Sequence, residues 1–250
     1  MPIEHLRLVA GQRNELEVET AGVRRFQCIN EAEPVELSVF TDGPIYVAHA
    51  TDEGQHVRLL REAERIRGYR GAYQLVNGPM NPDLLYRYEP NTWNNAKPGR
   101  ATDRDIQQLR ALFIDIDPER PKNISSTDAQ LREAWEVSDR LESWLASELG
   151  DSFPLGHGCS GNGYFTLIAI EPEPPTADTV KRISVFLKML NDKFRTPNVK
   201  IDTSVANAAR LMPAPGTWKR KGRDAAERPH RMTSFSCRSR VRRVPLKELV

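Results

Sequence analysis

The sequence predicts a mixed α/β protein built from two modules. Segments in which apolar residues alternate, as is typical of strands, are interspersed with segments whose apolar residues recur at helical spacing. A connection rich in Pro, Asn and Gly at residues 77–100 separates a shorter first half from a longer second half. With 39% apolar residues among 250, the chain can form a sizeable core.

The first half predicts a small α/β module that follows an N-terminal arm. Residues 1–34 alternate weakly and predict a peripheral arm or short strand pair. From residue 35 to 98 we expect, in order, a hairpin around Asp42-Gly43-Pro44, a helix ending near Gly68, a strand and a short helix.

The second half, residues 99–250, predicts strands joined by two crossing helices. The apolar run "LFIDIDP" predicts a strand, and the spacing of apolar residues over Thr127–Leu149 predicts a long amphipathic helix. Residues 153–171 predict a strand, a Gly-rich turn and a second strand. A second helix over Thr176–Phe194 and a final strand in "RPHRMTSFS" complete this module.

Composition narrows the functional class. No apolar run is long enough for a membrane span and the N-terminus is too charged for a signal peptide, so we expect a cytoplasmic protein without a membrane partner. The three cysteines lack metal-type spacing, which favours reduced structural thiols. Between residues 210 and 250 there are twelve basic residues and three acidic ones. Such a segment favours contact with nucleic acid or nucleotide, and a solvated tail is the alternative.

Two acids stand out inside the apolar run "LFIDIDP". Alternate side chains of a strand share a face, so Asp115 and Asp117 are expected on one face while Ile114 and Ile116 enter the core. Adjacent carboxylates repel unless a cation lies between them, and Mg²⁺ takes oxygen ligands. The pattern therefore predicts a metal site, with an ordinary solvent-facing strand end as the alternative.

A second segment, "KIDTSVANAARLMPAPGTWKRKG", strengthens the metal interpretation. Asp202 follows an apolar residue there, and Arg210 and the cluster Lys219 to Gly222 come after it. A further carboxylate followed by cations suits a metal-bound triphosphate. The turn Ser160 to Gly163 has glycines through which backbone N–H groups can approach a phosphate. A solvated loop and a plain hairpin turn are the respective alternatives.

The order of these motifs resembles a known family. "LFIDIDPERP", "SGNGYF", "KIDTSVANAARLMPAPGTWKRKG" and "ERPHR" succeed one another as in the catalytic domain of the archaeo-eukaryotic primase superfamily, in particular the primase-polymerases of plasmids, phages and other mobile elements. The segment "GAYQLVNGPMNPDLLYRY" adds to the likeness, which covers residues 35–245.

The resemblance implies a fold, a cofactor and a set of site residues. The core would consist of an N-terminal α/β module packed on a C-terminal RRM-like module, with the active site between them. Asp115, Asp117 and Asp202 would be catalytic and bind two Mg²⁺ or Mn²⁺ ions. The residues implied to bind nucleotide are Ser160, Asn162, Gly163, Phe165, Arg210, Lys219 and Lys221. Those assigned to DNA binding are Arg220, Arg223, Arg228, His230 and Arg231, although the "RPHR" element has bracing of the site as an alternative role.

One position departs from the family pattern. The family's Gly-rich motif continues with a histidine that contacts the nucleotide phosphates, and this chain has Phe165 there. A phenyl ring cannot donate to phosphate, so a neighbour substitutes, activity is weakened, or catalysis is lost. His157 is the candidate substitute, but pairing of Cys159 with Tyr164 would turn it to the other face. If the missing histidine is the only defect, Phe165→His restores activity.

Three functions follow. The first is template-directed nucleotidyl transfer, which makes or extends primers on single-stranded DNA from ribo- or deoxyribonucleoside triphosphates. The second is a primase-like domain without catalysis that binds DNA in a replication initiator, and Phe165 favours it. The third is a metal-dependent nuclease that uses the same acids. The ending "RVRRVPLKELV" resembles a domain edge, so we expect a C-terminal extension such as a helicase domain.

Overall fold

A computed structural model describes residues 34–150, 155–237 and 242–249. The N-terminal arm expected over residues 1–34 lies, apart from its last residue, outside the described residues. The described chain confirms the mixed α/β class. It has two five-stranded antiparallel sheets and a small two-stranded sheet.

The first sheet belongs mostly to the first half of the chain. Its strands, in spatial order, are β4 (Asn94–Asn95), β2 (Tyr46–Ala50), β1 (Val35–Thr41), β3 (Tyr69–Leu75) and β9 (Leu211–Pro213). Helix α3 (Glu53–Ala63) packs on this sheet, and the short helix α4 (Pro82–Leu85) follows β3. Asp52 caps α3, because its side chain accepts a hydrogen bond from the backbone N–H of Gln55.

The second, central sheet holds the acidic strand β5 (Leu109–Pro118) between β7 (Tyr164–Glu173) and the edge strand β8 (Val199–Ile201). Its spatial order is β12 (Ser234–Cys237), β6 (Leu155–Cys159), β7, β5 and β8. The segment between β8 and β12 also forms the two-stranded sheet of β10 (Trp218–Lys219) and β11 (Arg231–Met232). Two 3₁₀ turns, Asp103–Asp105 and Leu246–Glu248, lie at the periphery of the fold.

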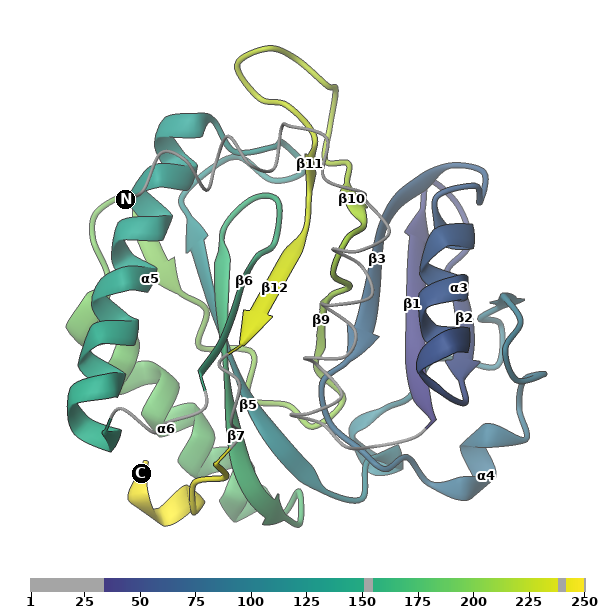
Figure 1. The fold of residues 1–250 in the computed structure, drawn as a ribbon, viewed down its shortest axis with the longest axis horizontal. Coiled ribbons are helices and arrows are strands. Elements are labelled where there is room, and N and C mark those ends of the chain that lie inside the picture. The colour runs from purple at the N-terminus through teal and green to yellow at the C-terminus, as the bar shows by residue number, and fades with distance from the viewer. Residues whose placement is uncertain (1–33, 151–154, 238–241, 250) are drawn as a thin grey trace.

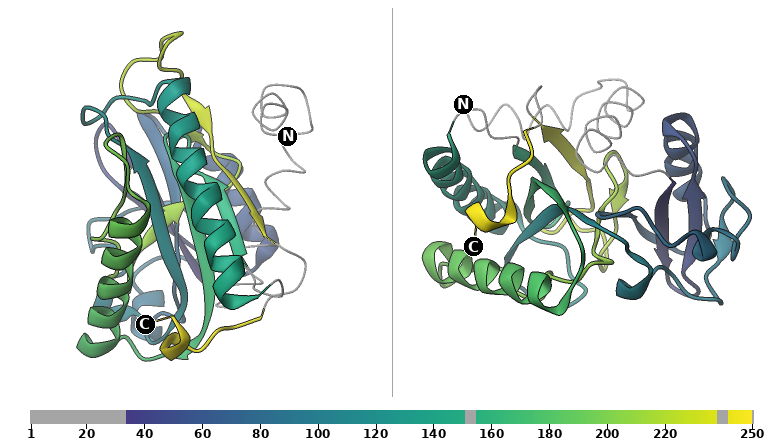
Figure 2. Two further views of the ribbon diagram at one scale, coloured as in Figure 1. Left: turned by 90° about the vertical axis from the view of Figure 1, so that its left-hand side faces the viewer. Right: turned by 90° about the horizontal axis from the view of Figure 1, so that it is seen from below.

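Two helices cover one face of the central sheet. Helices α5 (Asp128–Leu149) and α6 (Ala177–Phe194) lie side by side against it, and the first sheet lies across from its other face (Figures 1 and 2). Thr127 begins α5 with a capping box, in which its hydroxyl accepts from the N–H of Gln130 and the Gln130 side chain accepts in return. Buried side chains of both sheets and of the helices belong to one hydrophobic core.

A division of the chain at residue 98 does not describe the sheets completely. Strand β9 comes from the second half of the chain but pairs with β3 of the first sheet, with Gln74 opposite Met212. The N–H of Arg220 likewise donates to the carbonyl of Arg70 (2.8 Å). The segment between Asp202 and β12 therefore crosses to the first sheet and returns, which joins the two modules by backbone pairing. Among the described residues, no helix is long and apolar enough to cross a membrane.

Candidate active site

The paired acids lie on the open face of the central sheet. Strand β5 alternates as expected, with Ile114 and Ile116 fully buried on the helix-covered side. The side chains of Asp115 and Asp117 point to the opposite face and are 18% and 34% exposed. Both carboxylates are therefore half-enclosed and accessible to a ligand that approaches from the first sheet.

Asp202 joins them through the pairing of β5 with β8. Ile116 lies opposite Ile201, and the next residue along, Asp202, donates its N–H to the carbonyl of Asp115 (2.8 Å). Directly opposed residues of an antiparallel pair point to the same face, so Asp202 lies beside Asp115. One oxygen of Asp202 accepts from the N–H and the hydroxyl of Ser204 (2.9 and 2.7 Å). Its other oxygen faces Arg210.

Arg210 is the counter-charge between these acids. Its Nη2 lies 3.5 Å from Asp115 Oδ2 and 3.9 Å from Asp202 Oδ2, and its buried Nε has no hydrogen-bond partner among the described residues. Charge-assisted N–H to carboxylate bonds are usually about 2.7–2.9 Å, so this guanidinium is held loosely. Burial raises the pKa of Asp115, the charges of Asp117 and Asp202 raise it further, and Arg210 opposes the shift.

A second arginine, Arg120, was not recognised in the sequence. Its Nη2 lies 3.4 Å from Asp117 Oδ1, its Nε donates to the hydroxyl of Ser126 (3.0 Å), and its side chain is 7% exposed. Its position two residues after the strand in "LFIDIDPER" was the available signal. Lys221 lies close to Arg120 and to the two acids of β5. Burial lowers the pKa of the Lys221 amine and Arg120 lowers it further, whereas Asp117 and Asp115 raise it. Three cations thus surround the acids.

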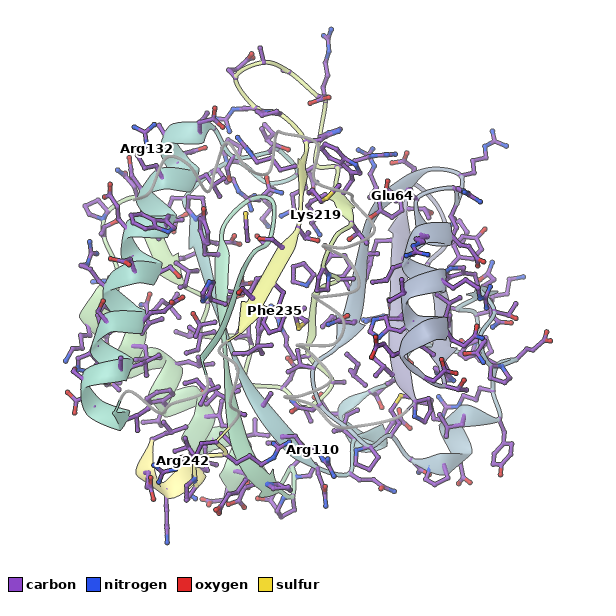
Figure 3. All side chains as sticks on the ribbon, viewed as in Figure 1. Glu64, Arg110, Arg132, Lys219, Phe235 and Arg242 are labelled. Atoms are coloured by element: carbon purple, nitrogen blue, oxygen red, sulfur yellow. The ribbon has the colours of Figure 1, made fainter. Side chains whose placement is uncertain are left out.

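Lys219 lies in the region between the two sheets (Figure 3). Its amine lies 3.7 Å from the ring centroid of Tyr73 on β3, and its side chain also packs against Gly71 and Gly161. The residue is 6% exposed, and burial followed by the nearby charge of Lys221 lowers the pKa of the amine well below its usual value. The structure therefore holds an amine at the seam whose charged form is disfavoured by desolvation.

The turn from Ser160 to Gly163 differs from the expected phosphate cradle. The N–H groups of Asn162 and Gly163 both donate to the hydroxyl of Ser160 (3.3 and 2.9 Å), and that of Gly161 donates to Cys159 Sγ. Asn162 is 2% exposed, and its side-chain oxygen accepts from the N–H of Ser126. These donors are thus satisfied within the protein. The glycine instead allows the turn to lie close to strand β5. A Cβ on Gly163 would lie 2.7 Å from Asp117 Oδ1 and 2.4 Å from the carbonyl oxygen of Ile116.

Phe165, for which the sequence predicts a nucleotide contact, is a core residue. It lies opposite Asp115 on the same face but is fully buried. Its ring stacks on Phe235 (centroids 6.0 Å apart, 9° between planes) and packs against Phe113 (5.6 Å). Phe235 and Gly158 cover the ring, so the Phe165 side chain has no exposed surface.

His157 does not replace the missing histidine. Cys159 pairs with Tyr164 and His157 with Thr166, which places His157 on the helix-covered face of the sheet. There its Nδ1 lies 3.5 Å from Glu142 Oε2 of α5. The pairing register of β6 and β7 therefore excludes His157 as the replacement for the missing histidine.

Most residues expected to bind DNA also make contacts within the protein. Arg228 donates to the carbonyl of Ser125 (2.7 Å), and Arg231 donates to the carbonyl of Ser126 (2.8 Å), just before α5. His230 hydrogen-bonds within its loop, through Asp224 and Gly222. Arg220 pairs with Glu64 (3.8 Å) and lies over the ring of Tyr69. Arg223 is exposed. Of the alternatives for "RPHR", bracing is the one for which the structure has contacts.

The donor set suits a metal that is completed by its substrate. In the described part of the chain, no three His, Cys, Asp or Glu side chains are gathered closely enough to enclose a metal ion. Mg²⁺, however, commonly takes only one or two carboxylates and completes its shell with water and substrate phosphates. Asp115 and Asp117 provide such a pair, with Asp202 beside them. The residues fit a divalent ion that enters with a phosphate ligand once Arg210 moves aside.

Comparisons with known proteins give structural likenesses but no family. No protein-family model matches the chain, and no curated protein matches it. Among solved structures, the chain is similar to the AEP domain of the primase-polymerase of cyanophage S-2L. That likeness has a TM-score of 0.47 at 11% sequence identity and covers 99% of this chain and 93% of that one.

Proposed function

We propose that this chain is a metal-dependent nucleotidyltransferase that synthesises or extends primers on single-stranded DNA, as in the archaeo-eukaryotic primase superfamily that its motifs resemble. The observation that carries the proposal is the row of three carboxylates on one sheet face, with Arg120, Arg210 and Lys221 around it. Acids distant in sequence meet there beside cations, an arrangement that suits metal ions and a triphosphate together.

The proposed mechanism divides the roles between acids and cations. Asp115 and Asp117 would hold Mg²⁺ or Mn²⁺, with Asp202 as a further ligand. When bound, two such ions favour ionisation of the attacking 3′-hydroxyl and stabilise the charge of the departing pyrophosphate. Lys221, Arg120 and Lys219 would bind the triphosphate and neutralise its charge. Arg210 would leave the acids for a phosphate oxygen, because a guanidinium binds phosphate well and is only loosely held here.

A primer-extension assay tests this function. Wild-type protein with Mn²⁺, labelled nucleotides and a primed single-stranded template should yield extended products, and Asp115→Ala with Asp117→Ala should abolish them. The matched control removes two exposed acids of α5, Glu136→Ala with Asp139→Ala, and should leave extension intact. Wild-type protein without extension activity would contradict the proposal, as would full activity in the Asp115, Asp117 double variant.

A second candidate is a DNA-binding domain without catalysis. Arg210 favours it, because its guanidinium already neutralises Asp115 and Asp202 without a metal. In that case the double variant should bind single-stranded DNA at least as well as the wild type, and neither protein should extend a primer. Cleavage of labelled DNA without added nucleotide would instead indicate a nuclease.

A further inference from the structure

A polar pocket adjoins the acids at the edge of the central sheet. It has a volume of about 680 Å³ and extends from Asp202 to the end of α6. Its lining includes Glu119 and Lys200 beside the acids, and Asn191, Arg195 and Thr196 at the end of the helix. Small-molecule sites commonly have volumes of about 300–1,000 Å³, so this pocket is large enough for a ligand.

The pocket and the Gly-rich turn lie on opposite flanks of β5. Strand β5 has β7 on one side and β8 on the other. On the β7 side, Gly163 lies against Asp117 and Lys219 packs on Gly161. On the β8 side, Lys200 lies directly opposite Asp117 and lines the pocket. Asp117 therefore lies between the pocket on one flank and the Gly-rich turn on the other.

Phosphoryl transfer requires the attacking and leaving groups to lie on opposite sides of the reacting phosphorus. In a nucleotidyl transfer, the attacking oxygen and the leaving pyrophosphate lie roughly in line on opposite sides of the phosphorus. If the triphosphate of the incoming nucleotide lies toward Lys219 and Lys221, its pyrophosphate departs toward the β7 side. The attacking hydroxyl must then come from the β8 side, where the pocket is.

We propose that this pocket binds the nucleotide whose 3′-hydroxyl attacks, that is, the 3′-terminal nucleotide of the primer. The 3′-oxygen forms a bond to the α-phosphorus, the bond to pyrophosphate breaks, and the hydroxyl proton passes to solvent. The inference rests on the proposed function. Arg195 is exposed and suits the backbone phosphate, while Lys200 pairs with Glu119 (2.9 Å) where both side chains are 52% exposed. Such an exposed pair is weak, so Lys200 can turn to a phosphate at little cost.

Photocrosslinking tests the position of the primer end without requiring catalysis. A primer–template duplex that ends in 3′-terminal 4-thiothymidine is irradiated with the whole protein, and the modified peptide is identified by mass spectrometry. The proposal expects modification within residues 191–203. Modification confined to residues 217–231, or no crosslink at all, would overturn it.

A parallel arm distinguishes two sources of the 3′-hydroxyl. Free 4-thiouridine triphosphate is irradiated with the protein in place of the duplex. Modification of residues 191–203 by the free nucleotide supports the pocket as a site for the first nucleotide of a new primer. Modification of that segment by the duplex alone supports it as a site for an existing primer end.

Kinetics of a pocket variant provide a second measurement. Arg195→Ala should raise the KM for the primer end about tenfold, as expected for a lost charge-assisted contact, and leave the KM for the incoming nucleotide unchanged. Lys188→Ala removes an exposed cation of α6 outside the pocket and should change neither value. An unchanged primer KM in Arg195→Ala would contradict the role of Arg195.

The two proposals fail in different ways. If the protein crosslinks the primer end at residues 191–203 but forms no product, the pocket remains and the catalytic function is wrong. If it extends primers while the crosslinks lie only at 217–231, the function remains and the pocket assignment is wrong.

Discussion

The ring of Phe165 occupies the space in which the related motif would place a phosphate contact. It is fully buried between Phe113 and Phe235, and Gly158 packs directly against it. An imidazole at this position would lose aromatic contacts and bury a polar ring among apolar ones. We therefore expect that a histidine at position 165 does not by itself restore a phosphate contact.

Phe165→His should destabilise the protein by about 2–4 kcal/mol and should not raise activity. Chemical denaturation measures the first effect, and primer extension by the remaining folded protein measures the second. Phe165→Leu keeps the site apolar and should cost less. A Phe165→His variant of unchanged stability and higher activity would show that the ring lies near bound phosphate after all.

Gly163 controls the approach of the turn to the acids. A Cβ there would lie within 2.7 Å of Asp117 Oδ1, so Gly163→Ala must displace either the turn or that carboxylate. We expect at least a tenfold loss of extension activity, because a small misplacement of catalytic groups is costly. Gly43→Ala is the matched control, since its Cβ would meet only the Thr41 hydroxyl at 3.9 Å. Equal activity of both variants would contradict this role.

At the scale of elements, helix α3 is joined to β3 by a buried polar pair. His56 is fully buried, its Nε2 lies 3.0 Å from Gln74 Oε1, and burial lowers its pKa to about 4. The unfolded chain has a histidine pKa near 6.5, so between these values unfolding takes up a proton. This contribution to stability is complete above pH 6.5 and is lost as the pH falls toward 4.

The His56 contribution should amount to about 3 kcal/mol across this range. Urea unfolding of the wild type and of His56→Gln, measured from pH 4.5 to 7, isolates it from other titrating groups. The glutamine keeps a partner for Gln74 and does not titrate. The wild type should therefore lose stability more steeply toward low pH, and identical slopes would refute the assignment.

At the scale of the whole molecule, the sequence predicted features that depend on neighbouring residues better than features that depend on distant segments. The faces of Asp115 and Ile116 follow from the two-residue period of a strand, and helix α5 follows from the helical spacing of its apolar residues. Both depend on neighbours in sequence. The meeting of Asp202 with Asp115 depends on a pairing between distant segments, and only the resemblance to a family indicated it.

The features that the sequence did not predict depend on partners far along the chain. Strand β9 joins the first sheet because its three residues pair with the edge of β3. The turn at Ser160 keeps its N–H groups for itself because the Ser160 hydroxyl folds back over them. Phe165 is buried because β12 brings Phe235 over it. None of these partners is visible from spacing or composition.

The seam between the modules provides a last prediction, because it contains a buried cation that folding alone does not require. Lys219 lies over Tyr73 without a carboxylate among the groups that shift its pKa. Lys219→Met keeps a long apolar side chain there, so the free energy of unfolding should stay the same or rise by about 1–2 kcal/mol. Binding of a nucleoside triphosphate with Mn²⁺ should weaken about tenfold, as measured with a fluorescent nucleotide. Lys188→Met, a control that replaces an exposed cation of α6, should change neither. A less stable Lys219→Met variant with unchanged nucleotide binding would show that the amine serves the fold.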